Sequence, residues 1–237
     1  MKPTDKESWT LADSAAEYGI DQWGDGYFSI SDSGTVQVMP DRTPSSAVDL
    51  KSLVDRLGDR GLQLPILLRF NGILRDRLQR LNRCFQIAIE DHDYTNRYRC
   101  VFPIKVNQQR EVVQQVAAEG ASLGFGIEAG SKPELLAAIA MSPSCAPIVC
   151  NGFKDEEFVR LAMMAQRLGR TVFPVIEKAS ELDLILRVAS EIGVRPTIGM
   201  RVKLATRGSG RWHDQIEFRG LFDYWKYGSS QTLCHHG

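Results

Sequence analysis

The sequence contains no long hydrophobic run and no excess of charge of either sign. No apolar stretch among its 237 residues approaches the roughly 20 residues that a membrane-spanning helix needs. Residues 1–7 lack the apolar core of a signal peptide. The 29 basic residues balance the 29 acidic ones, which argues against a surface built for nucleic acid or for a membrane. We therefore expect neither nucleic acid nor a membrane as a partner.

Cysteine is scarce, and the spacing of the cysteines does not indicate a metal site. The five cysteines are Cys84, Cys100, Cys145, Cys150 and Cys234. They form no pair with the spacing of a metal site, and their number is odd, so a full disulfide framework is excluded. Reduced thiols in the cytoplasm are the plain inference.

The first part of the chain reads as a strand-rich region over residues 1–60. Residues 23–30 and 35–38 have the pattern of a hairpin, with Asp32-Ser33-Gly34 as its turn. Residues 49–57 then place apolar side chains at helical spacing. Nothing in this region has the pattern of a catalytic motif.

From Leu64 onward, short apolar segments alternate with amphipathic ones. We predict strands at residues 65–70, 99–106, 123–127, 147–150, 171–176 and 197–204. We predict helices at residues 73–89, through 112–116, and at 132–141, 155–168 and 180–192. Strands that are almost continuously apolar, alternating with helices, indicate a parallel sheet covered by helices. Two closures fit this pattern, an open doubly wound sheet and a (β/α)₈ TIM barrel.

Two observations favour the barrel. The dinucleotide fingerprint G-x-G-x-x-G is absent after the first strand, where Phe70-Asn71-Gly72 stands instead. Polar residues follow several strands, as in barrels that carry their chemistry at the carboxyl ends of the strands. They are Lys105, Asn107, Glu128, Asn151, Glu177, Arg201 and Lys203. Because a full barrel needs about 250 residues, we predict an incomplete one over residues 61–214, followed by an aberrant tail, 215–237.

Lys105 lies near the end of the predicted strand 99–106. Burying a lysine as a cation is costly. One interpretation is a surface lysine whose stem packs on apolar neighbours while its amine reaches water. The other is an amine of lowered pKa that forms an imine with an aldehyde, most often pyridoxal 5'-phosphate. The strand alone leaves both open.

The segment from Glu128 to Glu134 joins the third strand to its helix. Ser131 and Glu134 match the S-x-x-E capping box, and Pro133 fits a first helical turn. Glu128 instead sits at the strand end, where a barrel keeps its reactive groups. Capping and catalysis are compatible for this segment.

Several segments in the same order resemble one family, biosynthetic arginine decarboxylase. This family belongs to the pyridoxal-phosphate class that shares its barrel with alanine racemase and with ornithine and diaminopimelate decarboxylases. The matching segments are residues 18–24, 64–70, 103–108, 126–134, 151–155 and 202–212. A set of motifs in one order is more specific than any single one, and it favours the imine interpretation of Lys105.

The resemblance implies roles for four residues. Lys105 would be the Schiff-base lysine, while Glu128, Glu134 and Arg201 would lie beside the cofactor. It also implies decarboxylation of L-arginine to agmatine and carbon dioxide for polyamine (spermidine) synthesis, in a cytoplasmic homo-oligomer. Magnesium is used in the family, although no residue here can be assigned to it.

The resemblance ends near His213. The family continues into later barrel strands, with a glycine-rich phosphate loop and a glutamate at the pyridine nitrogen, and then into a β-rich domain. We interpret the change as a frameshift or a truncation, and expect little decarboxylase activity from this chain alone. The alternatives are a non-catalytic protein that associates with full-length subunits, or another pyridoxal-phosphate-dependent amino-acid decarboxylase.

Overall fold

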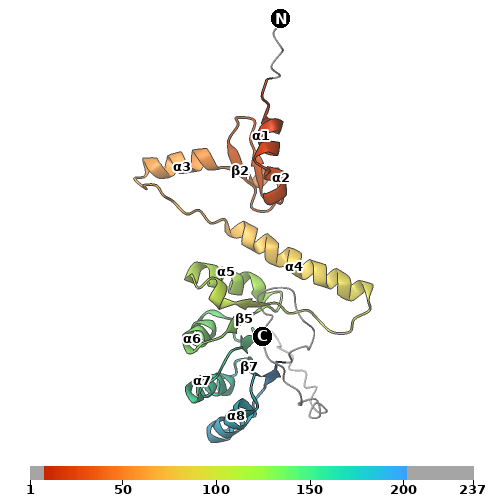
Figure 1. Ribbon diagram of the computed structural model, residues 1–237, viewed down its shortest axis with the longest axis vertical. Coiled ribbons are helices and arrows are strands. Elements are labelled where there is room, and N and C mark those ends of the chain that lie inside the picture. The colour runs from red at the N-terminus through yellow and green to blue at the C-terminus, as the bar shows by residue number, and fades with distance from the viewer. Residues whose placement is uncertain (1–7, 202–237) are drawn as a thin grey trace, which may run out of the picture. The chain divides into compact units, whose positions relative to one another are not determined.

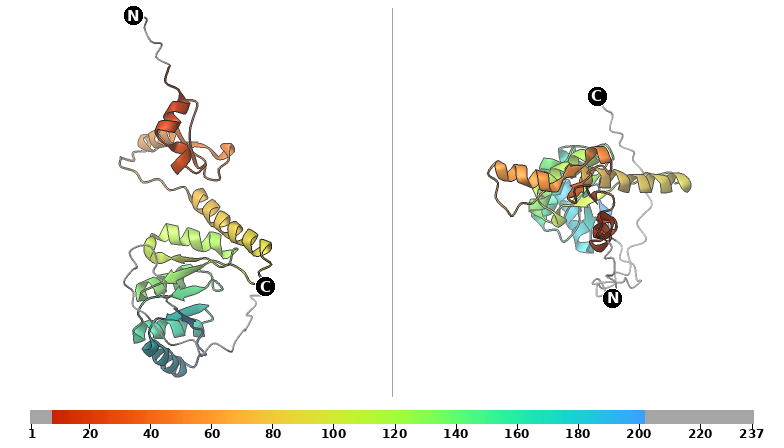
Figure 2. Two further views of the ribbon diagram at one scale, coloured as in Figure 1. Left: turned by 45° about the vertical axis from the view of Figure 1, so that its right-hand side comes forward. Right: turned by 90° about the horizontal axis from the view of Figure 1, so that it is seen from above.

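The structure is a computed structural model that describes residues 8–201. The chain divides into two compact units, residues 1–98 and 99–237, and each is described by itself (Figures 1 and 2). The domain boundaries expected from the sequence, near residues 60 and 214, stay a prediction. The second of them and the expected tail lie outside the described residues.

The first unit contains a small antiparallel sheet. Its strands are β1 (Phe28–Ile30), β2 (Val36–Val38) and β3 (Val48–Asp49), in that order across the sheet. The β1–β2 hairpin confirms the predicted one, with Gly34 in the turn at a φ of +79° that favours glycine. The short elements around the sheet are α1 (Leu11–Glu17), α2 (Ile20–Trp23) and the 3₁₀ turn η1 (Pro44–Ser46).

Two longer helices complete this unit, α3 (Leu50–Asp59) and α4 (Asn71–Asp91). Asp49 caps α3 by accepting the Ser52 N–H at 2.7 Å, which satisfies a free donor of the first turn. Asp25 is held by Arg77 and Arg80 of α4, at 2.8 Å from each. These ion pairs attach α4 to the turn that precedes β1.

The strand predicted at residues 65–70 was wrong. No regular structure occurs there. Leu67 within the segment is 74% exposed, and Leu64 just before it is 70% exposed. A strand needs a partner for its backbone groups, and within the described part of the chain this segment pairs with no strand. Apolar composition alone is therefore not enough to predict a strand in this segment.

The second unit alternates strands and helices. The strands are β4 (Val101–Pro103), β5 (Gly126–Ala129), β6 (Ile148–Cys150), β7 (Val172–Ile176) and β8 (Gly199–Met200). The helices are α5 (Arg110–Ala121), α6 (Lys132–Met141), α7 (Glu156–Arg167) and α8 (Ala179–Ile192), and a 3₁₀ turn, η2 (Ile104–Val106), follows β4. All neighbouring strands pair in parallel, which confirms the predicted α/β class.

The five strands lie in chain order, β4-β5-β6-β7-β8. A doubly wound sheet reverses its strand order at a switch point, whereas consecutive βα units of a barrel do not. Figure 1 shows α5 to α8 stacked along one face of this sheet. The described strands therefore have the arrangement of a partial TIM barrel.

Burial alternates along the strands because successive side chains point to opposite faces of the sheet. Ile127, Ile148 and Val172 are in register and buried in the core beneath the helices. Glu128, Val149 and Phe173 form the next register row and are only partly buried. The face opposite the helices is therefore the one that carries the polar residue Glu128.

Two predicted strands differ from the observed ones at their ends. Residues 123–125 close helix α5, with the Phe125 N–H donating to the Gly120 carbonyl at 2.9 Å, so β5 begins only at Gly126. β4 ends at Pro103, and Lys105 lies in η2 rather than in a strand. The predicted strand 197–204 is observed at β8, and its residues after 201 lie outside the described range.

Two adjacent leucines of α6 test the position of the core. Leu135 is fully buried and Leu136 is 53% exposed. We expect Leu135→Ala to lower the free energy of unfolding by about 2–5 kcal/mol, because it removes buried methyl groups and leaves a cavity. Leu136→Ala, the matched control, should change it by about 0.5 kcal/mol or less. Equal effects in urea denaturation would contradict this packing.

Candidate functional site

The polar residues predicted at the strand ends gather along the carboxyl edge of the sheet in the second unit, apart from Lys203, which lies outside the described residues. Pro103 pairs with Glu128, and Ile176 pairs with Met200. The segments that follow β4, β5, β6, β7 and β8 therefore leave the same edge of the parallel sheet. This edge, from Lys105 to Arg201, is the candidate site.

Lys105 and Glu128 are brought together at one end of this edge. The Lys105 Nζ lies 4.0 Å from the Glu128 Oε1, with the lysine side chain 64% exposed and the glutamate side chain 23% exposed. Buried Ile104 anchors the turn that carries the lysine. The amine is accessible from solvent and has an acid beside it, as a covalent binding site requires.

Glu134 has a positioning role in the loop next to Lys105. Its Oε2 accepts the Gly130 N–H at 2.7 Å, and its Oε1 accepts a longer bond of 3.4 Å from Gln108 Nε2. Ser131 caps α6 as predicted, accepting the Glu134 N–H. The reciprocal bond differs from a capping box, because Glu134 reaches the N–H of Gly130 rather than that of Ser131.

The loop after β6 needs glycine. Gly152 has a φ of +90°, and a Cβ added there would lie 3.3 Å from the Gly130 carbonyl oxygen. A side chain would be strained by this conformation and would press on the loop after β5. The close approach also directs the Gly152 N–H to the Glu177 Oε1, at 2.9 Å.

Glu177 and Arg201 pair at the other end of the edge, with the Arg201 NH1 3.2 Å from the Glu177 Oε1. Burial alone would raise the pKa of Glu177, but the hydrogen bond from Gly152 and the bond and charge of Arg201 outweigh it and hold that pKa below its usual value. Arg201 contacts Glu177 rather than Lys105 or Glu128, and it follows β8, three strands beyond β5. Glu177 was noted from the sequence only as a polar residue at a strand end.

Three other nucleophiles near this edge, Cys150, Lys132 and Lys154, are less available than Lys105. Burial raises the pKa of the Cys150 thiol to about 12, so it stays protonated. Lys132 is held by Asp155 and Glu157, which together raise its pKa. Lys154 is fully buried and engaged with main-chain carbonyls. The buried pair that Lys154 forms with Glu181 was missed from the sequence, although Lys154 lies in the matching segment 151–155.

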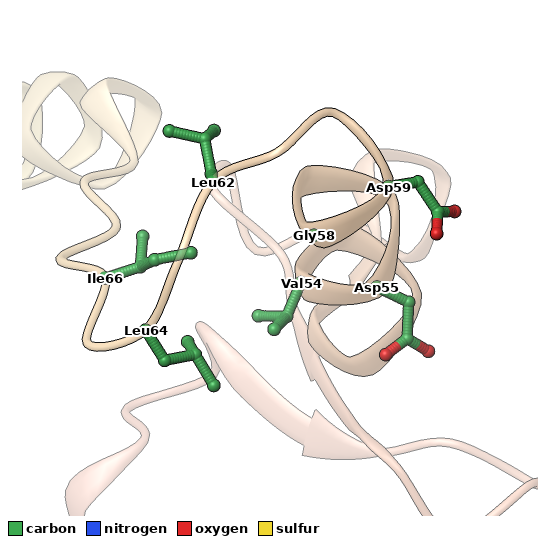
Figure 3. A pocket seen from close by; sticks show the side chains of 7 residues that line it. All are labelled: Val54, Asp55, Gly58, Asp59, Leu62, Leu64 and Ile66. Atoms are coloured by element: carbon green, nitrogen blue, oxygen red, sulfur yellow. The ribbon is translucent and has the colours of Figure 1, made fainter.

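The first unit has a hollow between α3 and the segment that follows it (Figure 3). Val54, Leu62, Leu64 and Ile66 line it, and the carboxylates of Asp55 and Asp59 point away from these aliphatic side chains. None of the four residues predicted for the site lies there. This hollow offers apolar contact and no reactive group.

Metal ligands are not grouped within residues 8–201. No three His, Cys, Asp or Glu side chains of that range could hold one ion together, so no residue can be assigned to magnesium. No helix in the same range is long and apolar enough to cross a membrane.

The residues of the edge fit an aldehyde cofactor that also carries an anionic group. They include an exposed amine, an acid 4.0 Å from it, and an arginine on the same edge of the sheet. Fold and site together define a barrel-type α/β protein with an accessible lysine at the edge where such folds place their chemistry.

Comparison with known proteins identifies the family. Residues 75–218 match the family described as "Pyridoxal-dependent decarboxylase, pyridoxal binding domain". The chain belongs to this family.

Similar proteins include biosynthetic arginine decarboxylases. The one from Rhodopirellula baltica is 73% identical over 214 residues, which are 90% of this chain and 32% of that protein. The one from Pseudomonas aeruginosa is 48% identical, over 89% of this chain and 33% of that protein. The chain thus spans about a third of the length of the curated relatives it matches.

Two solved structures of decarboxylases are similar to this chain. The biosynthetic arginine decarboxylase SpeA from Campylobacter jejuni superposes with a TM-score of 0.71 at 33% identity, over 78% of this chain and 30% of that one. A diaminopimelate decarboxylase from M. jannaschii gives a TM-score of 0.56 at 22% identity, which supports the fold alone. These neighbours have the TIM-barrel fold, as expected from the sequence.

The Glu177–Arg201 pair makes stability depend on pH. Because the pKa of Glu177 is lowered on folding, its stabilisation is complete above the unfolded pKa and is lost as the pH falls through the folded pKa. We expect Glu177→Gln to lower the free energy of unfolding by roughly 1–3 kcal/mol at neutral pH. The difference from wild type should vanish in acid.

The stability difference between wild type and Glu177→Gln can be measured by thermal unfolding, followed by circular dichroism at several pH values from acid to neutral. Asp183→Asn, which changes an exposed carboxylate on α8, is the control and should show no such pH-dependent difference. A constant difference at every pH for Glu177→Gln would contradict the ion pair.

Proposed function

We propose that this chain supplies the residues that hold pyridoxal 5'-phosphate in an arginine decarboxylase, and that Lys105 is the covalent attachment point. The observation that carries the proposal is the accessible Lys105 amine, 4.0 Å from the Glu128 carboxylate at the carboxyl edge of a parallel sheet. The 73% identity with a biosynthetic arginine decarboxylase supports arginine as the substrate class.

When bound, pyridoxal phosphate supplies an electron sink that stabilises negative charge at the carbon losing its carboxylate. The protein residues have narrower tasks. Lys105 provides the amine. Glu128, whose carboxylate lies 4.0 Å from the lysine nitrogen, can take or return a proton there through one bridging water.

Glu134 and Arg201 have different tasks from Lys105 and Glu128. Glu134 fixes the Gly130 N–H and so shapes the loop beside Lys105. Arg201, turned by Glu177, offers a guanidinium to an anionic group on the cofactor or substrate. The release of carbon dioxide is then favoured by positioning and by charge.

The substrate, the product, the pathway and the cellular location belong to the same proposal. We propose that the substrate is L-arginine, the product agmatine, and the role polyamine synthesis in the cytoplasm by a homo-oligomer. Magnesium would act outside the residues discussed here. The 22% identity with diaminopimelate decarboxylase gives no reason to prefer another substrate.

Covalent trapping tests the attachment point. We expect borohydride added to the chain with pyridoxal phosphate to label Lys105, located by peptide mass spectrometry. Lys105→Arg keeps the positive charge but cannot form the bond, so the label should disappear. Lys132→Arg is the control and should keep it, because Lys132 is paired with two carboxylates. Labelling of another lysine in wild type would refute the assignment.

Substrate and reaction are tested by exchange with the Rhodopirellula baltica relative. The 214 residues that match would be replaced by those of this chain. We expect the chimera to release labelled carbon dioxide from carboxyl-labelled arginine in preference to ornithine. Lys105→Ala in the chimera should reduce the rate by on the order of 10³-fold or more. A chimera that folds, traps the cofactor and prefers ornithine would exclude arginine.

A further inference from the structure

Lys154 and Glu181 form a buried ion pair behind the carboxyl edge. The Lys154 Nζ lies 3.7 Å from the Glu181 Oε2, and the two side chains are 0% and 5% exposed. Burying two charges carries a desolvation penalty that their attraction need not repay, and well-packed apolar residues often serve stability as well. A role beyond stability is therefore worth seeking in what the pair contacts.

The pair bonds to the main chain of two loops at the edge. Lys154 donates from Nζ to the carbonyl oxygens of Gly152 and Val175. Glu181 accepts the Lys154 N–H at 3.2 Å with Oε1 and the Glu177 N–H at 2.8 Å with Oε2. Each charged group therefore holds both the loop after β6 and the end of β7.

These two loops carry the groups that direct Arg201. The Gly152 N–H donates to the Glu177 Oε1 at 2.9 Å, and the same oxygen receives the Arg201 guanidinium at 3.2 Å. The buried pair thus fixes the backbone that bears Glu177 and also the N–H that orients the Glu177 carboxylate. Arg201 itself is 45% exposed and depends on that carboxylate for its direction.

We propose that Lys154 and Glu181 are positioning residues, whose buried pair sets the Glu177 carboxylate and through it holds Arg201 at the cofactor edge. The part of this inference that concerns the cofactor rests on the proposed function. The part that concerns Glu177 and Arg201 stands on the hydrogen bonds alone, so the two can be tested apart.

The decisive variant replaces both charges at once. Lys154→Met with Glu181→Gln keeps side-chain size, leaves no unpaired charge and removes one of the two acceptors that hold the loops. The matched control is Glu156→Gln with Arg187→Met, which removes an exposed ion pair of 2.9 Å between α7 and α8. Circular dichroism and thermal unfolding establish that both variants are folded.

The measurement is the pKa of the Glu177 carboxyl by carbon-13 NMR on the full chain labelled at glutamate, with the signal assigned from Glu177→Gln. In the buried double variant we expect this pKa to rise toward the ordinary glutamate value, because the Gly152 and Arg201 contacts loosen and because the Lys154 charge, which also lowers it, is lost. Glu181→Asp keeps the Lys154 charge, so a rise in that variant reports the contacts alone. In the control it should stay where it is in wild type. An unchanged pKa in the folded buried variant would overturn the proposal.

A milder substitution guards against a variant that does not fold. Glu181→Asp keeps the charge and shortens the side chain by one methylene, so its carboxylate can no longer reach both N–H groups. We expect a smaller rise of the Glu177 pKa in the same direction. No rise in the folded Glu181→Asp protein would also overturn the proposal.

The link to the cofactor has its own readout, the affinity for pyridoxal phosphate from an absorbance titration. We expect roughly tenfold weaker binding in the buried double variant, about the loss of one charged hydrogen bond, and no change in the control. Unchanged affinity beside a raised Glu177 pKa would overturn this link. If wild type fails to trap cofactor at Lys105, the proposed function fails, while the Glu177 titration still decides the positioning role.

Discussion

Parallel pairing in chain order is the constraint on which the site depends. Because β4 to β8 run in the same direction, every following loop leaves the sheet at one edge, and residues distant in sequence meet there. Within the described part of this unit, α5 to α8 cover one face, and the row of Glu128, Val149 and Phe173 lies on the other, less buried face. The site follows from this geometry before any particular side chain is considered.

Three of the lysines near the edge show how surroundings decide what an amine can do. Lys154 gives its donors to carbonyls and faces a buried carboxylate, so it organises backbone. Lys132 is held by two carboxylates that stabilise its charge. Lys105 is 64% exposed and has its acid at 4.0 Å, which is too far for a direct hydrogen bond. Of the three, Lys105 has the most exposed side chain and the longest distance to an acid, as the proposed attachment of a cofactor needs.

The sequence predicted most of the second unit because apolar periodicity there coincides with the tertiary fold. Helix α6 was placed at its observed bounds, and Lys105 and Glu128 were predicted near the ends of two successive strands, which the structure pairs as β4 and β5. The misplaced segment at 65–70 shows the limit of this reasoning, since an apolar run becomes a strand only where a neighbour pairs with it. The Glu181 side chain was missed for a similar reason. Its position in sequence is that of an ordinary acid in the first turn of a helix, and only the fold reveals that it is buried against Lys154.

The order of support within the site runs from the core outward. Apolar strands fix the backbone of β6 and β7, the Lys154–Glu181 pair ties the loops that follow them, and Gly152 then delivers its N–H to Glu177. Arg201 receives its orientation last and lies closest to solvent. Side-chain exposure rises along this order, from 0% and 5% for Lys154 and Glu181 to 14% for Glu177 and 45% for Arg201, so the desolvation cost is borne where bonds are most completely satisfied. In the site that we propose, this order leaves the exposed Arg201 able to exchange its partner for a ligand while the groups behind it stay fixed.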